Sequence, residues 1–152
     1  MKKSTAIAYS ILIGLNIKEN NVLSYLDDAS RFIPSHGKFD NANTDNSLKM
    51  FKRGLKYGIP KQVMSDYGTQ FENQFMEDLK GVGSKHIKAR VKHPQSNGKA
   101  ERAIQTIKKL WNELGSFDKA VEHYNYKKPH MSLTNGKLRT PYQAFIEKQR
   151  KE

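Results

Sequence analysis

The sequence predicts a single α/β domain in which a mixed sheet carries helices on its surface. Two apolar, β-branched runs open the chain at 6–15 and 22–27, and helix and strand patterns then alternate towards the C-terminus. No repeat, low-complexity tract or linker divides the 152 residues, a length sufficient for one sizeable core. We therefore expect one domain over 1–152.

The first half of the chain is expected to form three strands, a helix and a fourth strand. The segment "NIKENN" joins the two opening runs as a hairpin, and a third strand covers 31–39 with a break near its proline. A helix begins at Asn43 or Thr44, either of which can cap it, and ends before Pro60. "KQVMSD" is then typical of a short buried strand that ends on Asp66.

Helices dominate the expected second half, with one strand at 84–93 between the first two of them. We expect helices at 72–81, from Lys99 onwards, at 116–126 and at 142–148. The helix from Lys99 has an apolar stripe and a separate polar stripe, the latter being Glu101, Gln105, Lys108 and Asn112.

Charge and composition restrict the class of protein. The 27 Lys and Arg outnumber the 15 Asp and Glu, so the formal charge of +12 favours a polyanionic partner, nucleic acid before an anionic membrane. Cysteine is absent, which excludes disulfides, thiolate zinc sites and a cysteine nucleophile. The apolar run at 6–15 mimics a signal peptide but is too short to span a bilayer. We expect a soluble, cytoplasmic protein without membrane contact.

Two carboxylates stand out by position. Asp66 ends a buried strand before a turn, and Glu101 opens a helix in a segment, 85–109, that has eight Lys or Arg and no other acid. A turn-forming Asp and a first-turn Glu that favours the helix dipole are the simpler explanations. Together, however, acids at a strand end and a helix start can hold Mg²⁺, which prefers oxygen ligands, against phosphate.

Four ordered motifs carry a resemblance to a known family. "LDDASRF", "MSDYGTQF", "HPQSNGKAER" and "YNYKKPHMSLTNGKLRTPYQAF" resemble the catalytic core of retroviral integrases and insertion-sequence transposases, over roughly 22–146. That resemblance implies a ribonuclease H-like fold, with an antiparallel three-stranded meander plus parallel strands flanked by helices. It also implies a triad of two Asp and one Glu holding two Mg²⁺ or Mn²⁺, DNA as partner, and a homo-oligomer.

The family's functional residues can be placed on this sequence by its motifs. Asp66 and Glu101 match the second and third metal-binding acids, with 34 residues between them where the family has about 35. The resemblance implies DNA contacts at five polar positions, those in the loop before the helix and those on the helix itself: Gln95, Asn97, Lys99, Arg102 and Lys108. Lys108 lies seven residues after Glu101, which is two helical turns, so both should project from one face.

The family's first metal-binding Asp has no counterpart. The window that should contain it is "LIGLNI", residues 12–17, and 1–18 holds no Asp or Glu. A hairpin turn centred between Glu19 and Asn20 would set Asp27 opposite Leu12, which makes Asp27 or Asp28 a weak substitute. Otherwise the first strand region, 1–20, is degenerate or truncated. The family's N-terminal DNA-binding domain also has no counterpart here.

Three functions follow from these patterns. The first is an integrase or transposase core, an Mg²⁺-dependent polynucleotidyl transferase for DNA integration and recombination, impaired because one metal-binding acid is missing. The second is a non-catalytic DNA-binding remnant of a transposase. The third is an unrelated RNA-binding protein, which would expose aromatic rings on a sheet. Packing explains the rings better, these being Phe32, Phe71, Phe75, Trp111 and Tyr124.

Overall fold

The computed structural model describes residues 10–17, 20–40, 43–65, 74–88, 94–130 and 137–150. A five-stranded sheet runs through the domain in the order β3-β2-β1-β4-β5. Its strands are β1 (Ser10–Ile17), β2 (Asn20–Asp27), β3 (Ser35–Phe39), β4 (Gln62–Ser65) and β5 (Lys85–Lys88).

Strand directions divide the sheet into two parts. β2 is antiparallel to both β1 and β3, whereas β4 is parallel to both β1 and β5. The helices are α1 (Thr44–Gly54), the 3-10 turn η1 (Leu55–Tyr57), α2 (Gln74–Gly81), α3 (Pro94–Leu114), α4 (Phe117–Tyr126) and α5 (Pro141–Arg150). The mixed α/β class expected from the sequence is confirmed.

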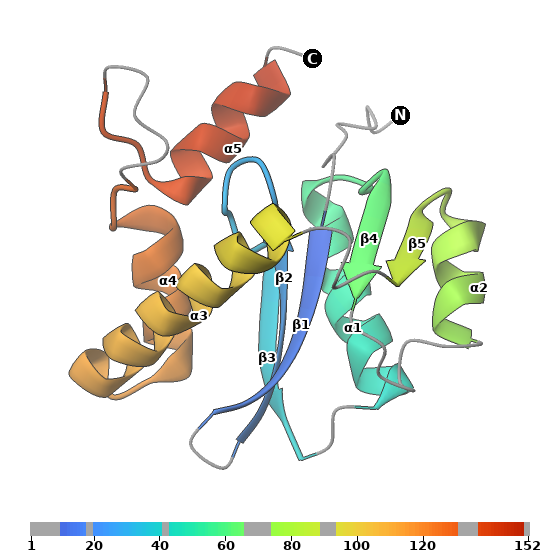
Figure 1. The fold of residues 1–152 in the computed structure, drawn as a ribbon, viewed down its shortest axis with the longest axis horizontal. Helices are drawn as coiled ribbons and strands as arrows, with labels where there is room; N and C mark the ends of the chain where they lie inside the picture. Colours follow the sequence, from blue (N-terminus) through green and yellow to red (C-terminus); the bar gives the residue numbers. More distant parts are fainter. Residues whose placement is uncertain are drawn as a thin grey trace.

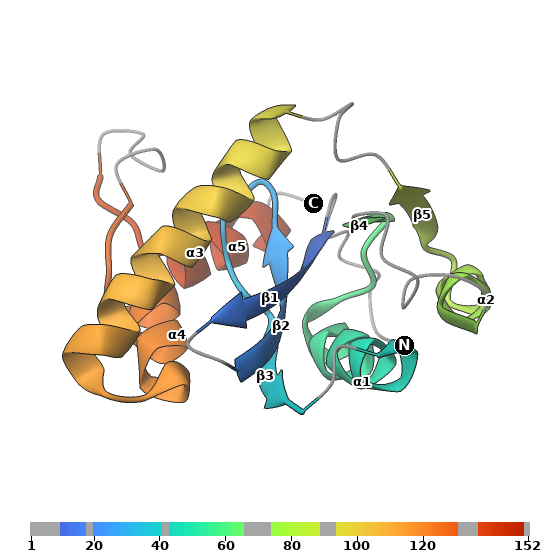
Figure 2. The same ribbon diagram turned by 60° about the horizontal axis from the view of Figure 1, so that its bottom comes forward.

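Helices cover both faces of the sheet. α3, α4 and α5 lie on one side and α1 on the other (Figure 1, Figure 2). Because successive side chains of a strand point to opposite faces, β2 and β4 each supply residues to both cores. Met64 packs with the α3 and α4 residues, and its neighbour Val63 packs with those of α1 and α2.

Aromatic side chains are used for packing in this fold. Phe32, Phe75, Trp111 and Tyr124 are all buried, and Phe71 lies outside the described residues. Their burial removes the exposed rings that an RNA-stacking surface needs.

Helix α3 begins five residues before the expected position. Its first residue is Pro94, so Gln95, Asn97 and Lys99 belong to the helix and not, as expected, to a preceding loop. The composition of "PQSNG" favours a turn, but proline fits the first position of a helix because its missing N–H would have no partner there. Gly98 costs about 1 kcal/mol within a helix, and the packing of the long apolar stripe outweighs that cost.

The turn after β2 is built around the carboxylate of Asp27. This side chain is 0% exposed, and its Oδ2 accepts hydrogen bonds from the main-chain N–H (3.0 Å) and the hydroxyl of Ser30. The backbone closes the same turn, since Arg31 N–H donates to Asp27 O and Asp27 N–H donates to Phe32 O, both at 2.8 Å. Arg31 takes a φ of 63° here, a left-handed conformation that non-glycine residues adopt at a cost.

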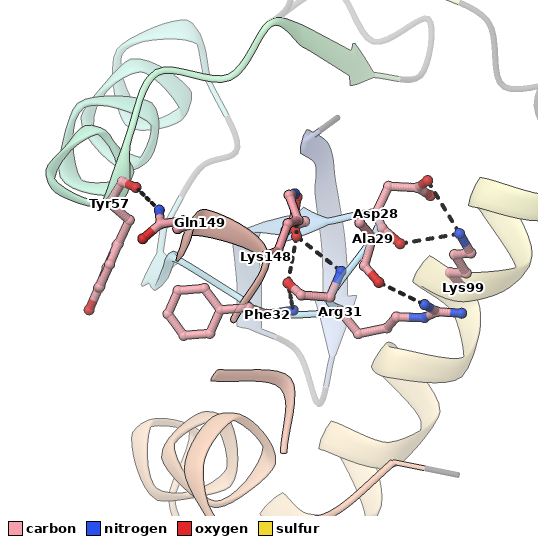
Figure 3. A network of polar contacts seen from close by, with 10 residues as sticks. Asp28, Ala29, Arg31, Phe32, Tyr57, Lys99, Lys148 and Gln149 are labelled. Carbon is pink, nitrogen blue, oxygen red and sulfur yellow. Dashed lines mark hydrogen bonds and ion pairs between the residues drawn. The ribbon is translucent and has the colours of Figure 1, made fainter. Parts of the chain in front are cut away.

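Helix α5 docks onto this turn from the far end of the chain. The ammonium of Lys148 contacts both carboxylate oxygens of Asp27, at 3.0 and 3.2 Å. Gln149 Nε2 donates to the main-chain oxygen of Tyr57 at 2.7 Å (Figure 3). The Phe145 ring stacks on Phe32 with centroids 4.8 Å apart. The C-terminal helix therefore fixes the turn that leads from β2 to β3.

Removing the cation from this buried pair should be costly. Lys148→Met leaves the Asp27 carboxylate without its charged partner in a buried position, and we expect the free energy of unfolding to fall by about 3–5 kcal/mol. The double variant Asp27→Asn/Lys148→Met removes both charges and should recover part of that loss. Urea denaturation of the single and double variants measures both effects.

The control for this cycle is Lys127→Met, which truncates an exposed lysine on the surface. Substitutions of that kind change stability by about 0.5 kcal/mol or less. Equal destabilisation by Lys148→Met and Lys127→Met would contradict the role given to the Asp27 pair.

The fold also predicts a dependence of stability on pH through His130. Its main-chain N–H donates to Arg139 O (2.9 Å), and its ring meets the Tyr124 ring edge-on. Burial, and then the positive charges of Arg31 and Lys128, lower the pKa of His130 from its usual 6.5. The unfolded chain then binds the proton more readily, so this contribution is complete above about pH 6.5 and is lost as the pH falls through the lower folded pKa.

Unfolding free energies at pH 7.5 and 5.5 test this expectation. The decrease between the two values should be smaller in His130→Gln than in the unsubstituted protein, because glutamine takes up no proton. An identical decrease in both proteins would show that His130 does not carry it.

Candidate active site

Helix α3 presents Glu101 and Lys108 to solvent. Both side chains are exposed, and their separation of seven residues brings them to nearly the same angle around the helix. The opposite stripe is buried against α4 and the sheet, and consists of Ala100, Ala103, Ile107, Leu110 and Trp111. Packing of this stripe sets which way Glu101 points, as its periodicity in the sequence predicts.

Lys99 lies on the other flank of α3. Its ammonium donates to the main-chain oxygen and to Oδ2 of Asp28, both at 3.2 Å, and joins α3 to the turn after β2 (Figure 3). Two residues along a helix correspond to about 200° of rotation, so Lys99 and Glu101 do not face each other. The structure therefore separates Lys99 from Glu101 and Lys108, with which it was grouped by sequence.

Arg102 occupies a third direction. It is exposed, lies about 100° around the helix from Glu101, and its guanidinium folds back over Gly98, where a Cβ would be 3.5 Å from Nη1. Lys99 and Arg102 thus flank the start of α3, and Lys108 lies further along beside Glu101.

Three of the other expected site residues lie wholly or partly outside the described structure. Asp66 lies outside the described residues, directly after Ser65, the last residue of β4. Gln95 and Asn97 are in the first turn of α3, but their side chains also lie outside the described part. Their roles stay predictions.

The hairpin register differs from the one expected. Ile17 pairs with Asn20 and Ser10 with Asp27, so Asp27 is not opposite Leu12 but two residues nearer the start of β1. The expectation placed the turn one residue too late. Runs that are apolar at nearly every position define this register weakly.

The carboxylates near the candidate site differ in whether their oxygens are free to bind a divalent cation. In the described part of the chain, Glu101 forms no hydrogen bond or ion pair, so its carboxylate suits a metal such as Mg²⁺. Asp27 is instead bonded to Lys148 and Ser30. Asp28 retains one buried oxygen, Oδ1, with no hydrogen-bond partner among the described residues, but it faces the Lys99 flank of α3. No three His, Asp or Glu gather within the described ranges.

Sequence reasoning missed the two ion pairs that anchor this region. Lys148 was assigned only to a terminal helix, yet it is bonded to Asp27, 121 residues away. Lys99 was assigned to DNA, yet it is bonded to Asp28 across 71 residues. The doublet "DD" before a turn was the only local signal, because nothing in the sequence indicates which distant lysine meets a buried acid.

Comparisons in sequence give limited matches. No family model matches the chain. A candidate integrase, ORF3 of Spiroplasma virus SpV1-C74, is 25% identical over 154 residues, which cover 82% of this chain but only 41% of the viral protein. An uncharacterized protein of Archaeoglobus fulgidus is 31% identical over 86 residues, 57% of this chain and 73% of that protein. Among the described residues, no helix is both long and apolar enough to cross a bilayer.

Comparisons in structure are more extensive. The catalytic core domain of BIV integrase superposes with a TM-score of 0.82 and 15% identity, covering 96% of this chain and 98% of that core. The HTLV-2 integrase core in complex with magnesium, in a trimeric form, gives 0.74 and 18%, covering 92% and 97%. A simian T-cell lymphotropic virus intasome chain gives 0.75 and 14%, covering 95% and 56%. The chain has the fold of the retroviral integrase catalytic cores.

Proposed function

We propose that this chain is an integrase-type catalytic core that binds DNA for integration and recombination. The observation that carries the proposal is the integrase-core fold over nearly the whole chain, combined with Glu101 on the exposed face of α3. Asp66 precedes it by the interval that the resemblance requires. In an intact form such a core attacks a target phosphodiester with a DNA 3′-hydroxyl.

Asp66 and Glu101 are the residues that would hold divalent metal. Bound Mg²⁺ or Mn²⁺ ions would polarise the phosphoryl group and stabilise the attacking and leaving oxygens, and one structural neighbour is a core in complex with magnesium. Glu101 fits this role because its carboxylate has no partner within the described residues. The free carboxylate is an oxygen donor of the kind that such ions prefer.

The basic residues of α3 would bind the DNA backbone. Lys108 projects from the same face as Glu101, two turns further along, and would contact phosphate near the reacting group. Arg102 would contact phosphate nearer the start of the helix, in the part that contains Gln95 and Asn97. Lys99 can bind phosphate only by leaving Asp28, so it contributes less affinity than an unpaired lysine. A homo-oligomer on DNA is the expected assembly, because solved neighbours occur in dimeric and trimeric forms and in an intasome.

Catalysis by this chain should be weak because 1–18 holds no carboxylate. Asp27 and Asp28, the substitutes considered for the first Asp, are each bonded to a lysine, so metal binding there would have to break an ion pair. The alternative function is a DNA-binding remnant without turnover, and the same missing acid favours it.

Restoring an acid on β1 tests the cause of the impairment. The parallel pairs Ser10–Val63 and Ile11–Met64 place β1 beside β4, and Asp66 follows β4 in the sequence. Since successive strand residues point to opposite faces, one of Leu12→Asp and Ile13→Asp should face the site. We expect near-background strand-transfer product from the unsubstituted chain with Mg²⁺ or Mn²⁺. One variant should give about tenfold more, which corresponds to an activation barrier lower by about 1.4 kcal/mol.

Asp66→Asn or Glu101→Gln in the activated variant should abolish the product, and Asn112→Gln, an exposed change further along α3, should not. Circular dichroism checks that each variant folds. If both folded variants remain at background, the missing acid is not the cause. Product that persists after Glu101→Gln would contradict the assignment of Glu101.

A further inference from the structure

A second basic surface lies on α1 and the segment that follows it. Six side chains between 46 and 61 are exposed, of which five are cationic, one is Ile59 and none is acidic. We call these five the α1 basic surface: Lys49, Lys52, Arg53, Lys56 and Lys61. The strand next to Lys61 adds a further exposed cation, Lys85, whose main-chain N–H donates to Lys61 O at 2.9 Å.

Helix geometry gathers these cations on one side. Lys49, Lys52 and Arg53 follow i, i+3 and i+4 spacing in α1, and Lys56 extends the row in η1. At about 100° per residue the four lie within an arc of about 100°. The buried residues of α1 occupy the opposite arc and pack on the sheet, these being Ser47, Leu48, Met50, Phe51 and Gly54.

This surface is electrostatically uncompensated. Within the described ranges none of its five cations forms an ion pair, and the exposed acid of α1, Asp45, lies in the first turn, before the row begins. The Lys56 ammonium also lies 5.1 Å from the Tyr57 ring centroid, a contact that attracts the cation but leaves its charge unneutralised. Unpaired cations spaced about 6 Å apart along a helix suit the repeating charges of a phosphate backbone.

The α1 basic surface is separate from the candidate active site. α1 and α3 pack on opposite faces of the sheet (Figure 2). Lys61 precedes the N-terminal end of β4, whereas Asp66 follows its C-terminal end. A four-residue strand spans about 13 Å, so the two regions lie at different ends of β4 as well as on different faces.

We propose that the α1 basic surface binds the backbone of a second DNA duplex, distinct from the duplex contacted by α3. The inference rests on the proposed function, in which joining requires two DNA segments. A helix that inserts into a membrane surface has an apolar face beside its basic one, and Ile59 is the one large apolar side chain exposed between 46 and 61. A second copy of a chain with a formal charge of +12 would bring like charges together.

A two-duplex capture assay tests the proposal. The protein is bound to a biotinylated duplex on beads, and capture of a fluorescent second duplex is measured. Lys49→Gln/Lys52→Gln/Arg53→Gln/Lys56→Gln should lower capture at least tenfold. The slope of log K for the second duplex against log salt concentration should become shallower by about 3–4, because each phosphate that the protein neutralises contributes about 0.9 to its magnitude.

The matched control is Lys119→Gln/Lys127→Gln/Lys128→Gln/Lys137→Gln, which removes the same charge from exposed positions elsewhere and should lower capture less than threefold. The charge-preserving variant Lys49→Arg/Lys52→Arg/Lys56→Arg should keep capture intact. Thermal melting verifies that all three fold.

The outcomes separate this inference from the proposed function. If Lys108→Gln weakens binding of the first duplex while the α1 variant matches its control, only the α1 inference fails. If the unsubstituted chain binds no duplex, the proposed function fails as well. A change in the sedimentation of the DNA-free α1 variant, with capture unchanged, would assign the surface to contacts between copies and overturn the inference.

Discussion

The arrangement around α3 depends on the buried carboxylate of Asp27. A charge without solvent must be bonded to remain ionised inside a protein, and Asp27 has Ser30 on one side and Lys148 on the other. Those bonds fix the turn after β2 and bring α5 against it. Asp28, the next residue, then meets Lys99 at the start of α3. One acidic doublet therefore joins both α5 and the start of α3 to the turn after β2.

Helix α3 consequently has two functional flanks. Lys99 faces the turn and serves structure, while Glu101 and Lys108 face solvent about 160–200° away around the helix. The buried stripe between these flanks is what separates them, since it fixes the rotation of the helix about its own axis. The motif suggests one DNA-binding set, which consists of Gln95, Asn97, Lys99, Arg102 and Lys108. These positions lie at different angles around the helix axis, so they are not equivalent.

Local patterns predicted much of the fold. Of the two cap candidates, Asn43 is the one used, with its side chain accepting from Asn46 N–H, and the apolar stripe of α3 is buried from Ala100 to Trp111. Long-range pairing could not be predicted. The hairpin turn was predicted one residue too late, because a strand sequence that is apolar at nearly every position does not define its register. The start of α3 was placed late, because tertiary packing overrides the turn preference of "PQSNG". Asp66, a central part of the predicted site, stays a prediction.

The position of Glu101 on α3 explains why its carboxylate has no partner in the described part of the chain although the helix is basic. Asp27, Asp28, Asp118 and Glu147 each contact a lysine, arginine or histidine. Glu101 has no such partner within the described residues, although Arg102 is next to it in sequence and Lys108 is two turns away. Neighbours at i+1 do not face each other on a helix, and a residue at i+7 is about 10.5 Å along its axis. The helix thus keeps Glu101 within a basic field but out of reach of a neutralising contact. A carboxylate held in that way retains its oxygens for a cation supplied from outside the chain.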